Sequence, residues 1–446
     1  MTSSSIRKML IRFSLLTGGR LAGAAATLVA SLLIAREMGA NTLGELSAIL
    51  AIVSVLSVFL SAGFPAVATI FTVEYTTKPR QGHLKGFIQA GWKHALFGLA
   101  LSVLLAVLFF FLPASPLSTP LLGSILSVIT AFLLAVTVFN GAVLVGLEQQ
   151  VAGLLSDTLL KPVVFLLLIV LAIVVGIGLD SSRLLALFAI SAAIACLLSY
   201  VFIRKTGFIA EDVVEESETR RWRAASYPWI ITSLVWDLFI ELHIILTSFL
   251  AAPAQVAILH IAFRFRVLAG FGMRSLYALF LPRITALNVQ QKTAQLNSQI
   301  QLANVLAFIY AVFVMVFFAL LGPLLMGLFG QEFEQGWLLL LIVSSTIPVR
   351  AIFGPAPAIL SMTGHQKPSV IAMLASLGFS LAASIALYPL WGVHGIAASY
   401  AVANFLGSLV LWLWAKKLTG IDSSLFSLIG TRNPVSHFRD LVSSLK

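Results

Sequence analysis

The chain has 446 residues, of which 59% are hydrophobic and only 10% charged, and its formal net charge is +11. Its mean hydropathy of +1.02 excludes an ordinary soluble protein, because a chain of this length cannot bury so much apolar surface away from water. The single cysteine, Cys196, excludes an intrachain disulfide and a cysteine-based metal site. In a membrane protein a basic excess first indicates orientation in the bilayer, so we expect no nucleic-acid partner.

The apolar runs predict helices that span a membrane. They are about 20 residues or longer and show no alternation of apolar and polar residues, which favours helices over barrel strands. Helices also pair their own backbone polar groups, as the bilayer requires. We therefore predict an all-α polytopic membrane protein with 12 transmembrane helices, near residues 12–35, 46–73, 87–112, 119–146, 158–179, 182–204, 227–250, 255–280, 301–329, 336–360, 368–390 and 394–415.

Loop charges predict the orientation of these helices. If the N-terminus is cytoplasmic, the loops on that side hold Lys78, Arg80, Lys85 and the Arg220–Arg223 cluster, whereas the loops on the other side hold no lysine. This positive-inside pattern requires an even number of spans. It predicts that the N- and C-termini are both cytoplasmic.

A long charged break divides the chain into two similar halves. Segments six and twelve end in related basic turns, Arg204–Gly207 and Lys416–Gly420. Because six helices form an even number, the two halves share one orientation, an arrangement in which transporters bind substrate between the repeats. The tail is expected to be an interfacial amphipathic helix or a disordered segment. The predicted parts are an N-terminal lobe (1–204), a charged cytoplasmic linker (205–226), a C-terminal lobe (227–417) and a cytoplasmic tail (418–446).

The eighth apolar segment carries four basic side chains. On a helical wheel His260, Arg264 and Arg274 fall within one arc, and Arg266 lies on the other side. Each arginine at the centre of a lipid-facing helix would cost about 2.5–3.5 kcal/mol. The three clustered cations are therefore predicted to face a polar cavity that binds an anionic substrate. The alternative is a set of structural ion pairs inside the bundle.

The seventh segment supplies two intramembrane carboxylates. Asp237 and Glu241 are four residues apart, and in a continuous helix they would share a face. Such residues are candidates for coupling transport to protons or sodium ions. Alternatively, they neutralise Arg264 or Arg274 of the next segment.

Two further arginines are candidate substrate contacts. Arg20 lies in the first segment beside several glycines, which permit close packing or bending. Arg350 lies in the stretch 347–357, where three prolines and a glycine predict a broken helix. The alternative for Arg350 is a kink with a snorkelling side chain. Asp157 and Lys161 are expected to form a structural i,i+4 pair.

No catalytic motif is present. The sequence has no phosphate-binding glycine loop with lysine, no His-Glu-x-x-His and no nucleophile elbow. The expected loops are too short to hold an enzyme domain. We predict that the protein is not an enzyme and uses no metal or other cofactor.

The stretch 33–47, which reads LIAREMGANTLGELS, resembles the end of the first helix and the first loop of bacterial polysaccharide transporters. These are the O-antigen and exopolysaccharide flippases of the multidrug/oligosaccharidyl-lipid/polysaccharide (MOP) exporter superfamily. Phe64 and Pro65, and the turns at 144–149 and 360–366, fit this resemblance as well. The twelve segments and the central linker extend it over the whole chain.

The resemblance implies a MATE-like fold whose two lobes alternate between inward- and outward-open states in the bacterial inner membrane. It implies a lipid-linked oligosaccharide as cargo, such as an O-antigen, exopolysaccharide or capsule repeat unit on polyprenyl pyrophosphate. The cargo would move from the cytoplasmic to the periplasmic leaflet. The expected partners of the protein are membrane lipids, a glycan polymerase and a chain-length regulator. Cationic interior residues of the family would correspond to Arg20, Arg264, Arg274 and Arg350. A cation-coupled exporter of small, drug-type molecules on the same fold is the alternative.

Overall fold

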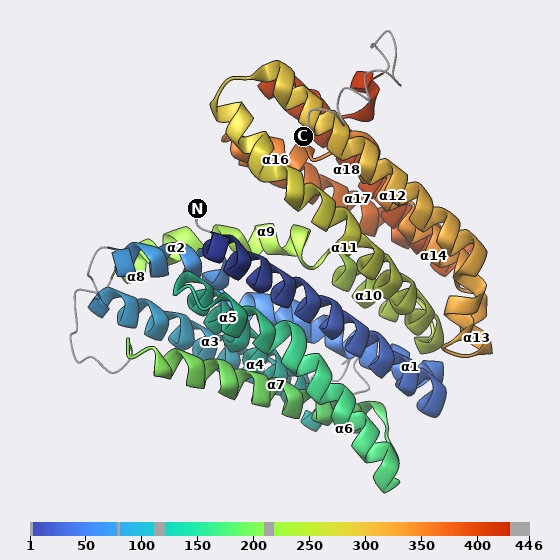
Figure 1. The fold of residues 1–446 in the computed structure, drawn as a ribbon. Coiled ribbons are helices and arrows are strands. Elements are labelled where there is room, and N and C mark those ends of the chain that lie inside the picture. The colour runs from blue at the N-terminus through green and yellow to red at the C-terminus, as the bar shows by residue number, and fades with distance from the viewer. Residues whose placement is uncertain (1–2, 78–80, 111–120, 209–217, 429–446) are drawn as a thin grey trace. The chain divides into compact units, whose positions relative to one another are not determined.

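The computed structural model describes residues 3–77, 81–110, 121–208 and 218–428, and the regular elements in these ranges are all helices (Figure 1). The chain divides into two compact units, Met1–Ile245 and Leu246–Lys446. This division lies inside helix α10 (Phe239–Leu250), later than the predicted linker 205–226. The predicted lobe boundaries stay a prediction, and two of their stretches, 209–217 and 429–446, lie outside the described residues.

Unit 1 begins with a long helix that contains a break. Helix α1 (Ser3–Ser61) has non-helical backbone at Gly39, with φ 85° and ψ 167°, so two helices meet there. A second interruption at Ala62 and Gly63, both with positive φ, separates α1 from α2 (Phe64–Thr77). The first two predicted segments thus correspond to the two parts of α1, and the second continues into α2.

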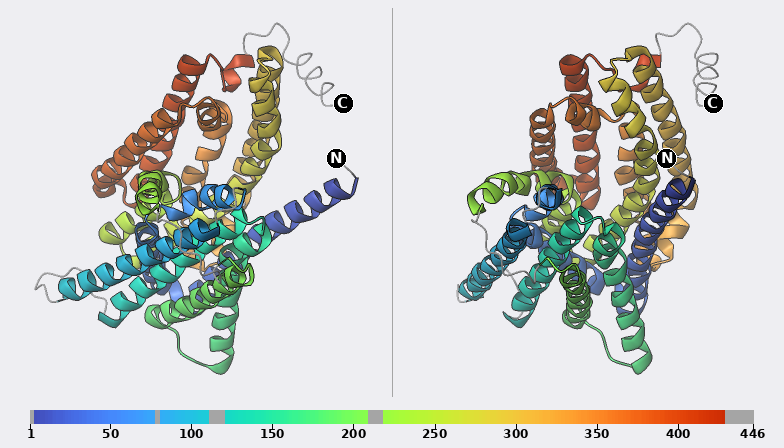
Figure 2. Two further views of the ribbon diagram at one scale, coloured as in Figure 1. Left: turned by 90° about the vertical axis from the view of Figure 1, so that its left-hand side faces the viewer. Right: turned by 60° about the vertical axis from the view of Figure 1, so that its left-hand side comes forward.

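The rest of unit 1 is built around α4 (Leu121–Gly146), which packs against α1, α2, α3, α5 and α7. Figure 2 shows this group from two further directions. Asn140 of α4 is fully buried, accepts a hydrogen bond from Trp92 Nε1 (2.8 Å) and donates one to the Ser199 hydroxyl (3.1 Å). The other helices are α3 (Gln81–Phe110), α5 (Gln150–Leu155), the π-helix η1 (Ser156–Leu160), α6 (Lys161–Val175), α7 (Ser181–Lys205), α8 (Thr219–Ser226) and α9 (Pro228–Trp236).

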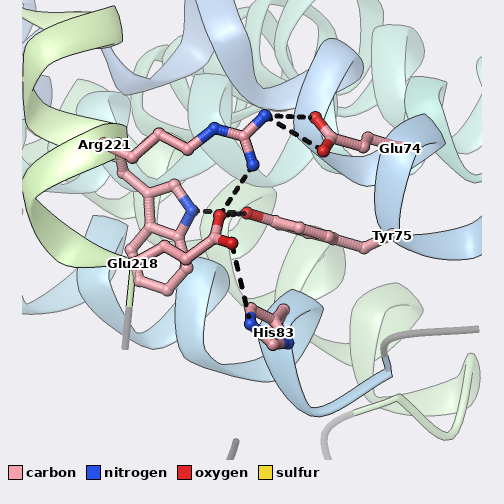
Figure 3. Close-up of polar contacts among 6 residues, drawn as sticks. Glu74, Tyr75, His83, Glu218 and Arg221 are labelled. Atoms are coloured by element: carbon pink, nitrogen blue, oxygen red, sulfur yellow. Dashed lines mark hydrogen bonds and ion pairs between the residues drawn. The ribbon is translucent and has the colours of Figure 1, made fainter. Parts of the chain in front are cut away.

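Helix α8, at the end of the predicted linker, packs onto unit 1 through a tryptophan. Trp222 is only 1% exposed, and its ring meets the Phe87 ring of α3 edge-on, with centres 5.6 Å apart. Trp222 Nε1 donates a hydrogen bond to the Tyr75 hydroxyl (2.8 Å), and this hydroxyl donates to Glu218 (2.6 Å; Figure 3). The charged break therefore ends in a docked helix.

Charged side chains surround this anchor (Figure 3). Arg221 donates to both carboxylate oxygens of Glu74 (3.0 and 2.8 Å) and to one of Glu218 (2.8 Å). The His83 ring lies 3.8 Å from Glu218. The hydrogen bond from Tyr75, opposed by partial burial and assisted by Arg221, lowers the pKa of Glu218 below its ordinary value.

Unit 2 is formed by long helices and one interrupted span. Helices α17 and α18 run side by side (Figure 2), and a Cβ at Gly395 would lie 2.6 Å from the Leu387 carbonyl oxygen, so glycine allows the close approach. The remaining part of α10 leads into this unit. Its other elements are α11 (Pro253–Val289), α12 (Thr293–Gly327), α13 (Gln331–Glu334), α14 (Trp337–Ser344), α15 (Thr346–Phe353), α16 (Ala356–Met362), α17 (Gln366–Trp391), α18 (Val393–Thr419) and the 3₁₀ helix η2 (Leu425–Leu428).

The predicted break in the tenth segment is confirmed. The axis bends by 50° between the pair α14–α15 and α16, at Gly354 (φ 70°, ψ −164°) and Pro355. Ser423, which follows α18, fills the bend, because its hydroxyl donates to the Phe353 carbonyl (2.7 Å) and its own carbonyl accepts from the Asn304 amide. The start of the predicted tail is therefore part of the packed unit.

Within the described residues, nine helices are long and apolar enough to cross a membrane, and eleven spans result if each of two bent helix pairs is one span. Counting α1 as two helices that meet at Gly39 would give the predicted twelve. The all-helical polytopic fold is confirmed. The number twelve and the cytoplasmic position of both termini stay predictions.

Candidate functional site

Helix α11 places the predicted basic residues in unit 2. Pro253 is its first residue, and the helix runs unbroken for 37 residues to Val289. His260 and Arg264 are one turn apart, and Arg264 Nε donates to His260 Nε2 at 3.1 Å. This bond requires the ring nitrogen to be unprotonated. The predicted shared face of these two residues is confirmed.

Arg266, which the helical wheel put on the opposite side, is fixed inside the unit. It is 6% exposed, its Nε donates to the Thr346 hydroxyl (3.1 Å) of α15, and its guanidinium lies 5.8 Å from the centre of the Tyr400 ring of α18. In the part of the chain that the structure describes, Arg266 has no carboxylate partner. A hydroxyl and an aromatic face hold the side chain in place but leave its charge uncompensated.

Arg350 of α15 lies close to the same group. It interacts electrostatically with Arg266 and Arg274 and with the hydroxyls of Tyr400 and Tyr277. Among the described residues it too forms no ion pair. Two neighbouring arginines with no acidic partner repel each other, and an anion bound between them would relieve that repulsion.

The structure thus divides the predicted cations into groups. Arg264 pairs with His260, whereas Arg274 lies in the range of Arg350, with its guanidinium 5.7 Å from the centre of the Phe271 ring. Arg20 belongs to unit 1 and is exposed on α1. The assignment of these arginines to substrate binding stays a prediction.

The expected geometry of the two carboxylates needs correction. Asp237 and Glu241 do not lie on one continuous helix, because α9 ends at Trp236, α10 begins at Phe239, and their axes differ by 64°. The backbone N–H groups of Asp237 and Leu238 both bond to the Ser233 carbonyl (2.9 and 3.2 Å), which ends the helical ladder. Asp237 instead lines a cavity in unit 1.

Sequence reasoning missed the hydroxyls beside the arginines. Tyr277 donates to the Asn304 side chain (3.1 Å), and Tyr400 contacts Arg266 from a helix far along the chain. Tyr277 follows Arg274 by three residues on α11, a spacing that could have indicated it. For metal binding, no cluster of three or more His, Cys, Asp or Glu side chains occurs in the ranges that the structure covers.

Comparison with known proteins identifies the family. A family model described as polysaccharide biosynthesis protein matches residues 12–287, from α1 through nearly all of α11. The chain belongs to the polysaccharide biosynthesis protein family. No curated protein sequence matches it. The match includes Arg264, Arg266 and Arg274, whereas Arg350 lies beyond it.

Solved structures with this fold are transporters. An inward-facing multidrug resistance MATE family transporter of the MOP superfamily is 14% identical, with a TM-score of 0.72 over 93% of this chain and 96% of that chain. A MATE structure in the bent conformation is 13% identical, with a TM-score of 0.59 over 92% and 95% of the two chains. The fold of this polysaccharide biosynthesis family member is therefore that of the MATE transporters.

Proposed function

We propose that this family member is a flippase that moves a polyprenyl-pyrophosphate-linked oligosaccharide from the cytoplasmic to the periplasmic leaflet of the bacterial inner membrane by alternating access. The O-antigen, exopolysaccharide or capsule repeat unit would be its cargo, which a glycan polymerase with its chain-length regulator would then use. The single observation that carries the proposal is the pair Arg266 and Arg350, which lie near each other without a carboxylate among the described residues.

A pyrophosphate matches this group chemically. Its oxygens are hydrogen-bond acceptors with negative charge, and the planar guanidinium of arginine binds two such oxygens at once. The hydroxyls of Tyr277 and Tyr400 lie within electrostatic range of Arg350. A cationic drug would instead meet repulsion here, and the family match to polysaccharide biosynthesis also does not favour the small-molecule exporter.

Coupling is proposed to use Asp237 or Glu241, the carboxylates on either side of the bend between α9 and α10. Replacement of both by the amides Asn and Gln would abolish any dependence of transport on pH or sodium. Unchanged ion dependence in this double variant would contradict the coupling proposal.

The cargo proposal is tested by charge removal at the arginine pair. Arg266→Gln and Arg350→Gln should each lower the rate of glycan flipping in proteoliposomes about 10- to 150-fold, the equivalent of a charge-assisted hydrogen bond of about 1.5–3 kcal/mol. Arg204→Gln is the matched control, because Arg204 is exposed at the end of α7 in unit 1.

Cells without the transporter should also accumulate lipid-linked oligosaccharide and lose surface glycan. The thermal unfolding temperature of each variant separates loss of folding from loss of binding. Normal glycan flipping by folded Arg266→Gln and Arg350→Gln proteins would refute the proposal.

A further inference from the structure

The two arginines of the candidate site lie near each other although their charges repel. Arg266 belongs to α11 and Arg350 to α15, and neither forms an ion pair among the described residues. Like charges stay together in a protein only where the surrounding structure holds them there. The hydrogen bonds among the helices of unit 2 show how α11 and α15 are held.

One of these bonds joins the two helices directly. Arg266 Nε donates to the hydroxyl of Thr346, the first residue of α15, at 3.1 Å. This bond ties the beginning of α15 to α11. The end of α15, at Phe353, is tied to α11 by a longer route.

That route passes through Asn304 of α12, which is fully buried. Tyr277 of α11 donates to Asn304 Oδ1 (3.1 Å), and Asn304 Nδ2 donates to the Ser423 carbonyl. The Ser423 hydroxyl then donates to the Phe353 carbonyl (2.7 Å). These three hydrogen bonds in series, called the Asn304 brace below, connect α11 with the end of α15.

The chemistry of the groups fixes the direction of each bond in the brace. A backbone carbonyl can only accept, so the amide nitrogen of Asn304 must face Ser423 and the amide oxygen must face Tyr277. Ser423 is fully buried as well, and Gly354 leaves room for it because glycine has no side chain. Hydrogen bonds shielded from water in this way are stronger than those at a surface.

We propose that Asn304 is a positioning residue that braces α11 against α15 and so keeps Arg350 beside Arg266. Arg350 lies between the two ties, four residues after Thr346 and three before Phe353. Without the brace, repulsion would separate the two guanidinium groups, and an anion would have to bring them together again at a loss of affinity. This inference rests on the proposed function and adds how the site is kept ready for its anion.

The test measures binding of polyprenyl pyrophosphate to the full-length protein in nanodiscs. Tyr277→Phe and Ser423→Ala each remove one oxygen atom, and they cut the brace on opposite sides of Asn304. Each should weaken binding about 2- to 10-fold, the equivalent of one neutral hydrogen bond. Because the bonds act in series, the double variant should bind no more weakly than the single variant with the larger loss.

Tyr310→Phe is the matched control. Tyr310 also joins α12 to α11, because its hydroxyl donates to the Ala269 carbonyl (2.7 Å), but it is not part of the brace. This variant should bind the lipid as the wild type does, whatever its unfolding temperature. A general loosening of the two helices would instead weaken binding in Tyr310→Phe and Tyr277→Phe alike.

Arg350→Gln separates the failure of the brace from the failure of the proposed function. If Arg350→Gln binds the lipid more weakly than the wild type but Tyr277→Phe binds it normally, only the brace is overturned. Losses that multiply in the double variant, or an equal loss in Tyr310→Phe, would overturn it as well. If the wild type does not bind the lipid, or if Arg350→Gln binds it equally well, the flippase proposal and the brace both fall.

Discussion

The docking of α8 on unit 1 allows a test of which kind of contact holds a helix in place. Trp222 is 1% exposed, whereas the Arg221 side chain is 47% exposed although it makes two ion pairs. We predict that Trp222→Ala destabilises the protein much more than Arg221→Met does. The burial of apolar surface by Trp222 should contribute more to the free energy of unfolding than the ion pairs of Arg221 do.

The magnitudes follow from these exposures. Truncation of a buried tryptophan to alanine costs about 3–5 kcal/mol, from lost apolar contact and the cavity that remains. Ion pairs at an exposed arginine contribute about 0–1 kcal/mol each after screening by water and salt, and methionine would retain some packing on Phe71. For a unit of this size, 1 kcal/mol shifts the unfolding temperature by about 2–4 °C, so Trp222→Ala should lower it by about 6–20 °C and Arg221→Met by only a few degrees.

The measurement is thermal unfolding of the purified protein in detergent at low and high salt. The decrease in unfolding temperature caused by Arg221→Met should become smaller at high salt, because salt screens ion pairs, whereas the decrease caused by Trp222→Ala should not change. Trp391→Ala serves as the control, because Trp391 is 61% exposed. If Arg221→Met destabilised as much as Trp222→Ala, the charge network would be the main anchor of α8 and the reasoning would be wrong.

Two further predictions concern the end of α18 and the bend in unit 2. Burial raises the pKa of Asp422, but hydrogen bonds from Lys416, Ser424 and Trp412 outweigh this effect and lower the pKa to about 2. Because the folded pKa lies below the ordinary value near 4, this stabilisation is present above about pH 5 and is lost as the pH falls through 4 toward 2. Acid unfolding curves of the wild type and Asp422→Asn should therefore converge at low pH, and curves that stay parallel would contradict this. Gly354→Ala should destabilise more than Gly364→Ala: both have positive φ, but only at Gly354 would a Cβ overlap a backbone atom, the Ser423 carbonyl oxygen. Equal unfolding temperatures of the two variants would show that backbone conformation alone sets the cost.

Features that depend on neighbouring residues in one helix could be predicted from the sequence. The spans are visible because each must carry about 20 apolar residues to cross the hydrocarbon layer. The pairs His260–Arg264 and Asp157–Lys161 follow from the helical repeat, and both are present. The bend at Gly354 follows from prolines that cannot continue a helix.

The break between Asp237 and Glu241 was not predictable in the same way. No proline or glycine marks it, so the helical repeat indicated a shared face that the structure does not contain. Local propensity is a weak guide where tertiary packing decides the end of a helix.

The sequence by itself determined that this protein is an all-helical membrane protein of a polysaccharide biosynthesis family, and that one helix carries His260, Arg264, Arg266 and Arg274. Only the tertiary structure decided which of those cations meet. Arg266 and Arg350 are 84 residues apart in the chain, and Trp222 reaches Tyr75 across 147. Helical periodicity fixes the neighbours within one helix, whereas contacts between helices depend on how their side chains pack, which no single segment of sequence contains.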